Sequence, residues 1–161
     1  MSKFPITQKG YEKLEQEIRD LKYIERPKIA QEIAAAREFG DLSENAEYHA
    51  AREKQSFAEG RILDLEDKMA RAEIIEIKKL SGDVVKFGAT VMLVDCDTDE
   101  EVEYIIVGEY EADISRRRIS IVSPIAKSLI GKKVGDFVEA HTPRGEKEYE
   151  ILSVQFEEFA I

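Results

Sequence analysis

Two long helical patterns separated by one short break constrain the fold of this chain more than any other feature. The first pattern has apolar residues at steps of three and four, the seam of a helix that packs on a helical partner: Tyr11, Leu14, Ile18 and Leu21. The seam of the second pattern consists of Ala51, Ala58, Ile62, Leu65, Met69 and Ala72. Two helices of roughly 30 residues, joined by a few residues, can only fold back as an antiparallel coiled coil about 45 Å long.

The ends of the two helices carry recognisable signals. Thr7 is the expected N-cap of the first helix, and Gly40 is the stop expected just past its end. Pro27 removes one backbone donor from the first helix, so we expect a kink or a local break there. The second helix should begin near Asp41 or Ser43. A thinner apolar stripe follows the proline and consists of Ile29, Ile33 and Ala36. The base of the hairpin should therefore be better packed than its tip.

The pattern changes after Lys78–Asp83 from helical to alternating and β-branched, which indicates a domain boundary. Strands are expected at about Val85–Val94, Val102–Val107, Ile119–Val122, Phe137–His141 and Tyr149–Gln155. Ser123–Gly131 predicts a short helix with a Ser cap, Pro at its first position and Gly after its end. Thr142–Gly145 predicts a hairpin turn. The predicted fold class is α+β, with an antiparallel coiled coil in residues 1–78 and a small antiparallel sheet with one helix in residues 79–161.

Composition limits the partners and the compartment. Charged residues make up 36% of the 161 residues and the net charge is -10, so the chain should have little affinity for free DNA. One cysteine, Cys96, cannot form an internal disulfide, and we expect it to be an inert packing residue. The first residues lack the apolar core of a signal peptide, and no apolar run could span a bilayer. We therefore expect a cytoplasmic protein without a membrane partner.

Asp41 and Glu44 are the candidate chemical groups, because both lie in the break between the helices. One interpretation is a capping box, in which each carboxylate satisfies an orphan amide of the second helix. The other is a site that meets metal and phosphate together, since Arg37 and Arg52 flank the tip from both sides. Mg²⁺ takes six oxygens and two carboxylates are too few to hold it, so this chain would complete a site that another molecule contains.

Three other motifs favour structural roles. Asp95–Asp99 imitates the start of a calcium-binding loop, but Glu100 stands where that loop needs Gly, so we expect a solvated hairpin loop. Arg116–Arg118 could contact phosphate, although a solvated turn is the commoner role of such a run. His49 and His141 have no partner at a recognisable ligand spacing, and we assign both to structural or surface roles.

The tip and several other segments together resemble the Gre transcript cleavage factors of bacteria, specifically the GreA type. The resemblance extends in family order over nearly the whole chain: Glu25–Pro27, Gly40–Glu53, Phe87–Val91, Ser123–Ala126 and Leu129–Gly131. It implies an N-terminal antiparallel coiled coil and a C-terminal domain of FKBP-like fold. The tail from Glu157 to Ile161 runs past the ending associated with the family, and we attach no function to it.

The resemblance also implies a function. Gre factors bind bacterial RNA polymerase through its secondary channel and stimulate the polymerase's own cleavage of backtracked nascent RNA, which rescues arrested elongation complexes. The family acids that match Asp41 and Glu44 help to hold the second Mg²⁺ of the polymerase and to position the attacking water. Arg37 and Arg52 match positions that contact the transcript. The protein would have no turnover of its own and no cofactor bound alone.

Several alternatives stay open on the sequence. A channel-binding inhibitor of polymerase would share the fold, although the presence of both Asp41 and Glu44 argues against it. A prolyl isomerase or chaperone would need a cluster of aromatic residues, which the second half lacks. A purely structural coiled-coil adaptor is the remaining class. Ser120, Ser123 and Pro124 form a candidate polymerase-docking loop, or they simply cap the short helix.

Overall fold

The computed structural model describes residues 2–41 and 43–159 and divides into two compact units. The first unit contains Tyr11–Ala72 together with Ser2, and the second contains Lys3–Gly10 and the chain from Glu73 onward. Lys3–Gly10 therefore group with the second unit, whereas the sequence-based division at residue 78 placed them in the first domain. None of the helices within the described residues is long and apolar enough to cross a membrane.

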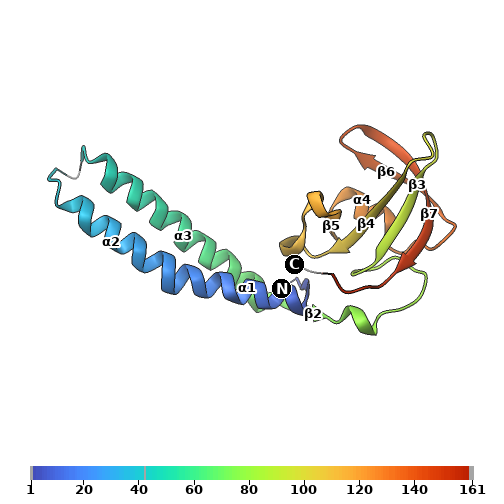
Figure 1. Ribbon diagram of the computed structural model, residues 1–161, viewed down its shortest axis with the longest axis horizontal. Coiled ribbons are helices and arrows are strands. Elements are labelled where there is room, and N and C mark those ends of the chain that lie inside the picture. The colour runs from blue at the N-terminus through green and yellow to red at the C-terminus, as the bar shows by residue number, and fades with distance from the viewer. Residues whose placement is uncertain (1, 42, 160–161) are drawn as a thin grey trace. The chain divides into compact units, whose positions relative to one another are not determined.

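The first unit is an antiparallel helical hairpin, as predicted (Figure 1). Its first arm consists of α1 (Gln8–Asp20), a π-helical segment (Leu21–Glu25) and α2 (Arg26–Arg37). Its second arm is α3 (Ala46–Arg71). The prediction that Thr7 caps the first helix is confirmed, because the Gly10 N–H donates to Thr7 Oγ1 at 3.0 Å.

The predicted irregularity at Pro27 takes the form of the π-helical segment immediately before it. The Arg26 N–H donates to the Leu21 carbonyl oxygen, five residues back rather than four. A proline ring in a regular α-helix clashes with the carbonyl four residues earlier, which here belongs to Tyr23. A wider turn relieves this clash while the helix continues, so Pro27 becomes one of the first residues of α2 instead of ending the arm.

The seam of the hairpin changes in character along its length. Larger side chains are buried toward the base, namely Leu14, Ile18, Ile62 and Leu65. Toward the tip the buried seam consists of two isoleucines and three alanines, namely Ile29, Ile33, Ala36, Ala51 and Ala58. Ion pairs also cross between the arms, such as the two hydrogen bonds from Arg26 to Glu59 at 2.8 and 3.0 Å. These pairs are exposed and solvent screens them, so they chiefly select the register of the arms.

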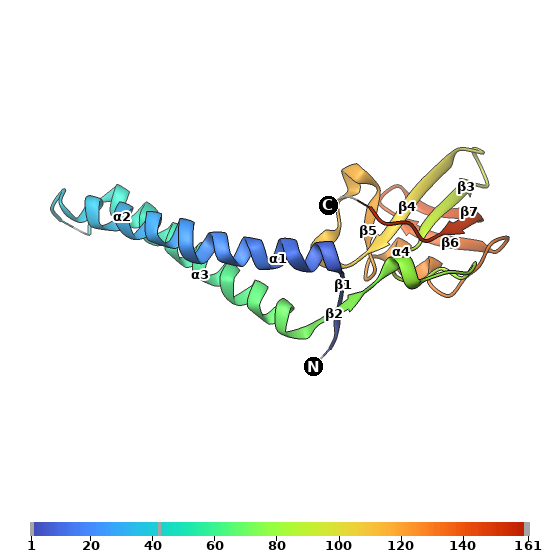
Figure 2. The same ribbon diagram turned by 60° about the horizontal axis from the view of Figure 1, so that its bottom comes forward.

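The second unit contains a five-stranded sheet in the order β5-β4-β3-β7-β6 (Figure 2). The strands are β3 (Thr90–Asp95), β4 (Glu101–Val107), β5 (Arg118–Ser120), β6 (Phe137–Thr142) and β7 (Gly145–Gln155). The predicted first strand from Val85 begins only at Thr90, because Gly88 turns the backbone with a φ of 85°. The predicted hairpin of the last two strands is confirmed, with Thr142 paired to Gly145 at its turn.

The prediction of a wholly antiparallel sheet is wrong at one edge. Strand β5 pairs with β4 in parallel, with Ile106 opposite Ile119. Residues 108–117 provide the crossover that a parallel pair requires, through the short 3-10 helices Glu109–Glu111 and Ile114–Arg116. The predicted short helix is α4 (Pro124–Leu129), and its Ala126 and Leu129 side chains are fully buried in the core under the sheet.

Two short strands were not predicted from the sequence. They are β1 (Phe4–Thr7) and β2 (Ala72–Ile75), which form a separate two-stranded sheet. Glu111 is buried against the end of β1, where its Oε1 accepts from the Thr7 N–H at 3.1 Å and its Oε2 accepts from the Thr7 hydroxyl. Gly108 lies so close to the Pro5 carbonyl oxygen that a Cβ would overlap with it. These contacts join the beginning of the chain to the second unit.

Candidate functional site

The candidate site is the loop between α2 and α3, which carries both predicted carboxylates. The first arm ends through N–H groups that each bond three residues back, Glu38 to Ala35, Phe39 to Ala36 and Gly40 to Arg37. Gly40, with a φ of 104°, then supplies the stop that the sequence predicted. Asp41 and Glu44 follow in the loop and are both exposed. Leu42 lies outside the described residues.

The capping-box interpretation of Asp41 and Glu44 is wrong. The N-cap of α3 is Asn45, whose Oδ1 accepts from the Tyr48 N–H at 3.0 Å, and the helix begins at Ala46 rather than near Asp41 or Ser43. Asp41, Asn45 and Ser43 are all favoured N-cap residues, so local preference alone does not choose between them. Glu44, just before the cap, is left exposed to solvent.

Asp41 instead closes a small turn with Ser43. Its Oδ1 atom accepts from the Ser43 hydroxyl at 2.8 Å and from the Ser43 N–H at 2.9 Å. The hydroxyl, followed by the N–H, holds the pKa of Asp41 below its usual value because both donors favour the charged form. Asp41 is therefore an exposed, ionised carboxylate at neutral pH.

The donor set at the tip suits a hard cation that another molecule holds. Carboxylate oxygens are the ligands that Mg²⁺ prefers, and the ion completes its shell with water or phosphate. Within residues 2–41 and 43–159, no three His, Cys, Asp or Glu side chains gather closely enough to hold a metal ion. Asp41 and Glu44 fit the role of two additional oxygen ligands.

The two predicted basic residues lie on the helices that flank the loop. Arg37 is the last residue of α2, and its guanidinium carbon lies 5.9 Å from the centre of the Tyr48 ring. Arg52, on α3, donates from Nη1 to Gln55 Oε1 at 3.0 Å. Both are exposed. A guanidinium stacked on an aromatic face keeps its outward N–H groups available to an anion.

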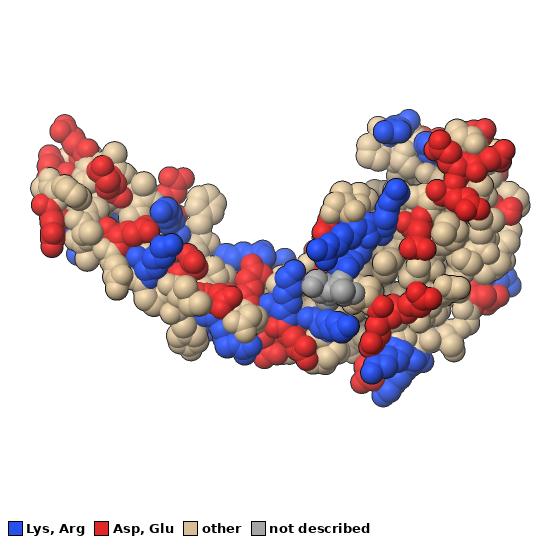
Figure 3. Space-filling view, in the orientation of Figure 1, with Lys and Arg blue, Asp and Glu red and all other residues tan. Residues whose placement is uncertain are grey.

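Charge is unevenly distributed along the hairpin surface. Acidic side chains dominate the end that carries the loop, while basic and acidic groups alternate farther along the arms (Figure 3). A free polyanion would be repelled at such an end. A strong positive charge, such as that of a bound metal ion, would stabilise the carboxylates.

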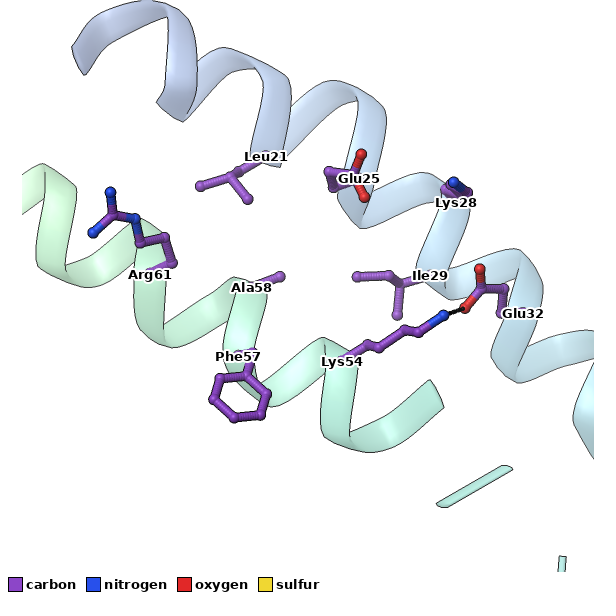
Figure 4. Close-up of a pocket in the computed structure, with 9 residues that line it drawn as sticks. All are labelled: Leu21, Glu25, Lys28, Ile29, Glu32, Lys54, Phe57, Ala58 and Arg61. Carbon is purple, nitrogen blue, oxygen red and sulfur yellow. Dashed lines mark hydrogen bonds and ion pairs between the residues drawn. The ribbon is translucent and has the colours of Figure 1, made fainter. Parts of the chain in front are cut away.

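A hollow of about 450 Å³ lies on the flank of the hairpin, away from the loop (Figure 4). Leu21, Ile29 and Ala58 point into it, and the ion pair between Lys54 and Glu32 lies along its edge at 3.2 Å. Residues of both arms line this hollow. The predicted site residues lie elsewhere.

The candidate docking residues have structural contacts of their own. Ser123 caps α4, because its Oγ accepts from the Ala126 N–H at 3.3 Å, and Ser120 Oγ accepts from the Val122 N–H at 3.2 Å. Pro124 is the first residue of the helix and is exposed. The capping alternative is confirmed for Ser123, and a docking role for the three residues stays a prediction.

Three residues that were assigned structural roles differ in burial from the expectation. Asp95 is buried at the start of its loop, where the Asp97 N–H at 2.9 Å and Lys147 Nζ at 3.1 Å hold its pKa below the usual value. Arg118 is buried beneath the Phe159 ring, so the expectation of a solvated turn is wrong for it, because it begins strand β5. Cys96 is exposed rather than packed, and partial desolvation with nearby Glu148 raises its pKa.

Comparisons with known proteins now identify the family. Residues 4–74 match the family model described as "Transcription elongation factor, N-terminal", and residues 80–156 match "Transcription elongation factor, GreA/GreB, C-term". The chain is 68% identical to the transcription elongation factor GreA of Rickettsia felis over 160 residues, covering 99% of each chain. It is 60% identical to the same factor of Orientia tsutsugamushi, covering 99% of this chain and 100% of the relative.

Solved structures also match most of the length of this chain. The structure of the transcription factor Gfh1 matches with 29% identity and a TM-score of 0.46, covering 96% of this chain and 99% of that chain. The GreA/GreB factor from Nitrosomonas europaea matches with 24% identity and a TM-score of 0.43, covering 97% and 100%. The sequence matches alone decide the assignment, and on their strength this chain belongs to the GreA/GreB family of transcription elongation factors.

Proposed function

We propose that this protein binds bacterial RNA polymerase through the secondary channel and stimulates the cleavage of backtracked nascent RNA. The single observation that carries the proposal is the pair of exposed carboxylates, Asp41 and Glu44, in the loop at the end of a helical hairpin. Family membership supports the choice of partner. The factor is an accessory protein, and the polymerase catalyses the cleavage.

The carboxylates contribute by completing a metal site. Asp41 and Glu44 would supply oxygen ligands to the more weakly held Mg²⁺ of the polymerase. The chemistry that the metal would supply there is the activation of a water for attack on the RNA phosphodiester. Asp41 is suited to this role because the hydrogen bonds from Ser43 keep it ionised and fix its orientation. Only Oδ1 accepts these hydrogen bonds, so Oδ2 would be the atom that binds the ion.

The basic residues would act on the transcript. Arg37 and Arg52 lie on opposite sides of the loop, and guanidinium groups bind phosphate with two parallel hydrogen bonds. They would hold the extruded RNA near the carboxylates while the acidic tip itself repels RNA that is free in solution. Binding to nucleic acid would therefore depend on the polymerase.

Cleavage by a backtracked elongation complex tests the proposal. Purified bacterial polymerase is stalled and backtracked, the protein and Mg²⁺ are added, and shortening of the RNA and release of a 3′ fragment are measured. The parent should stimulate cleavage, whereas Asp41→Asn and Glu44→Gln should each lose most of the stimulation at unchanged affinity for polymerase. Glu53→Gln, an exposed acid on α3, is the control that removes the same charge away from the loop.

Each alternative result has a clear reading. Equal stimulation by parent, Asp41→Asn and Glu44→Gln would contradict the metal role. Binding that slows the polymerase without cleavage would instead indicate the channel inhibitor. Cleavage of RNA by the protein and Mg²⁺ without polymerase would contradict the accessory role.

A further inference from the structure

Asn45 is buried at the base of the loop, although the residues on either side of it are exposed. Its side chain is 7% exposed. The amide oxygen accepts from the Tyr48 N–H at 3.0 Å, and the amide nitrogen donates to the Ala36 carbonyl oxygen at 2.6 Å. One side chain thus joins the last turn of α2 to the first turn of α3 across nine residues of sequence.

The amide oxygen of Asn45 caps α3, and its amide nitrogen bonds to α2. Capping α3 requires only an acceptor, which Ser, Thr or Asp would supply equally well. The bond to Ala36 requires a donor, and among the favoured cap residues only Asn offers an acceptor and an N–H donor on one rigid group. Ala36 already receives the Phe39 N–H at 3.1 Å, so helix termination does not depend on the second donor. The bond therefore closes the loop rather than satisfying an orphan carbonyl.

A second contact continues from this base toward Asp41. His49 Nε2 lies 3.2 Å from the Ser43 carbonyl oxygen, and since a carbonyl oxygen only accepts, Nε2 carries the hydrogen. Ser43 in turn donates twice to Asp41. The loop is therefore tied to α3 through His49 and to both helices through Asn45. Closing a loop at its base removes much of the conformational freedom of the residues it contains.

We propose that Asn45 is a positioning residue, whose bridge to Ala36 fixes the direction in which Asp41 and Glu44 leave the hairpin. This inference rests on the proposed cleavage function and adds a residue that neither binds metal nor contacts RNA. Ligands must meet a metal site within a fraction of an ångström, and a shift of about 1 Å can cost as much as 100-fold in rate. The bridge supplies that precision on a loop that is otherwise exposed.

Three substitutions separate the bridge from the cap. Asn45→Ser keeps a neutral cap but replaces the amide N–H donor by a shorter hydroxyl. Asn45→Asp keeps the cap but places a carboxylate against the Ala36 carbonyl, and Asn45→Ala loses both the cap and the donor. If the bridge positions the acids, all three should lower the maximal cleavage rate by about 10-fold or more at saturating factor. If only the cap mattered, Asn45→Ser and Asn45→Asp would match the parent, and that result would overturn the inference.

Two further measurements distinguish positioning from loss of folded protein. The variants should need more Mg²⁺ for half-maximal cleavage, while the factor concentration that half-saturates polymerase stays unchanged. A merely destabilised factor would show the reverse, a higher half-saturating concentration with a normal rate at excess, which would contradict positioning. Circular dichroism should show the helical content of the parent in Asn45→Ser.

A polymerase-free measurement decides the inference even if the proposed function fails. In the free protein, ¹⁵N relaxation should give lower backbone order parameters at residues 39–41 and 43–45 in Asn45→Ser than in the parent. Failure of the parent to stimulate cleavage would overturn the proposed function alone. Unchanged order parameters in Asn45→Ser would overturn the positioning role, whatever the parent does with polymerase.

Discussion

Asp41 and Ser43 form a closed pair in which one carboxylate oxygen accepts both the hydroxyl and the backbone N–H of the serine, at 2.8 and 2.9 Å. The hydroxyl is the larger cause of the low pKa of Asp41. Ser43→Ala should therefore raise the pKa of Asp41 toward its usual value while the backbone bond remains. Carboxyl NMR titration of the free protein measures this shift. Ser56→Ala, an exposed serine on α3, should leave the titration unchanged.

The same pair predicts the acid limit of activity. A carboxylate ligand must be ionised, so cleavage stimulation should fall as pH drops through the pKa of Asp41. Ser43→Ala should move this acid limb to higher pH, with little change in the rate near neutrality. A limb that stays in place in Ser43→Ala would mean that another group sets it.

Glu111 predicts a pH dependence of stability with the opposite sign. Burial raises its pKa, against the lowering effect of the Thr7 hydroxyl and N–H, the Gly108 N–H and the charge of Arg118. The folded chain therefore keeps a proton that the unfolded chain has released, and stability falls as pH rises from the ordinary value to the folded one. Glu111→Gln should remove this fall, because a glutamine does not titrate.

Chemical denaturation at several pH values measures this difference. The stability of Glu111→Gln minus that of the parent should increase with pH across the window and then level off. Taking the difference cancels carboxylates with lowered pKa values, such as Asp95 and Asp113, whose stabilisation is lost as pH falls. Glu109→Gln, an exposed neighbour, should give a flat difference. A flat difference for Glu111→Gln as well would show that Glu111 is not kept protonated.

Gly108→Ala should destabilise the second unit. The new Cβ would overlap with the Pro5 carbonyl oxygen, which is backbone and cannot rotate away, so β1 must shift. Overpacking of this kind costs about 1–3 kcal/mol. Urea unfolding followed by a probe in the second unit measures the loss. A variant as stable as the parent would show that β1 does not lie against this turn.

Gly60→Ala is the matched substitution with the opposite expectation. Gly60 lies within α3, and nothing is found within 4 Å of the position its Cβ would take. Alanine should stabilise the helix by about 0.8–1 kcal/mol, because glycine has the greater conformational freedom when unfolded. The helical signal at 222 nm during thermal unfolding checks it, and a lower midpoint would contradict the expectation.

The sequence predicted the elements whose signal is periodic. The two arms, their seam and the short helix after Ser123 were all expected from spacing and caps, because burying one face of a helix needs apolar residues at regular intervals. The strand β1 escaped notice because it is four residues long and contains Pro5, which demotes a strand pattern. The parallel edge strand β5 also carries no local sign of its direction, since direction depends on the path of the crossover.

At the candidate site the residues were predicted but their arrangement was not. Asp41 and Glu44 have the spacing of a capping box, and that local pattern suggested a role that Asn45 in fact performs. What selects Asn45 is its bond to Ala36, a contact between two helices that no local window contains. The strong preference for Asn at N-caps was the one available signal.

The contacts of Thr7 with Glu111 have a practical consequence for anyone who wishes to study the two halves apart. A fragment that starts after residue 78 would carry Glu111 without the hydroxyl and N–H that satisfy it, and a deprived carboxyl in the interior is costly. A fragment that ends there would keep β1 and its partner strand β2 but would lose the contacts of Thr7 with Glu111. Residues 3–10 therefore belong with the second unit, and a faithful dissection must supply them to it as a separate peptide or by relocating the terminus.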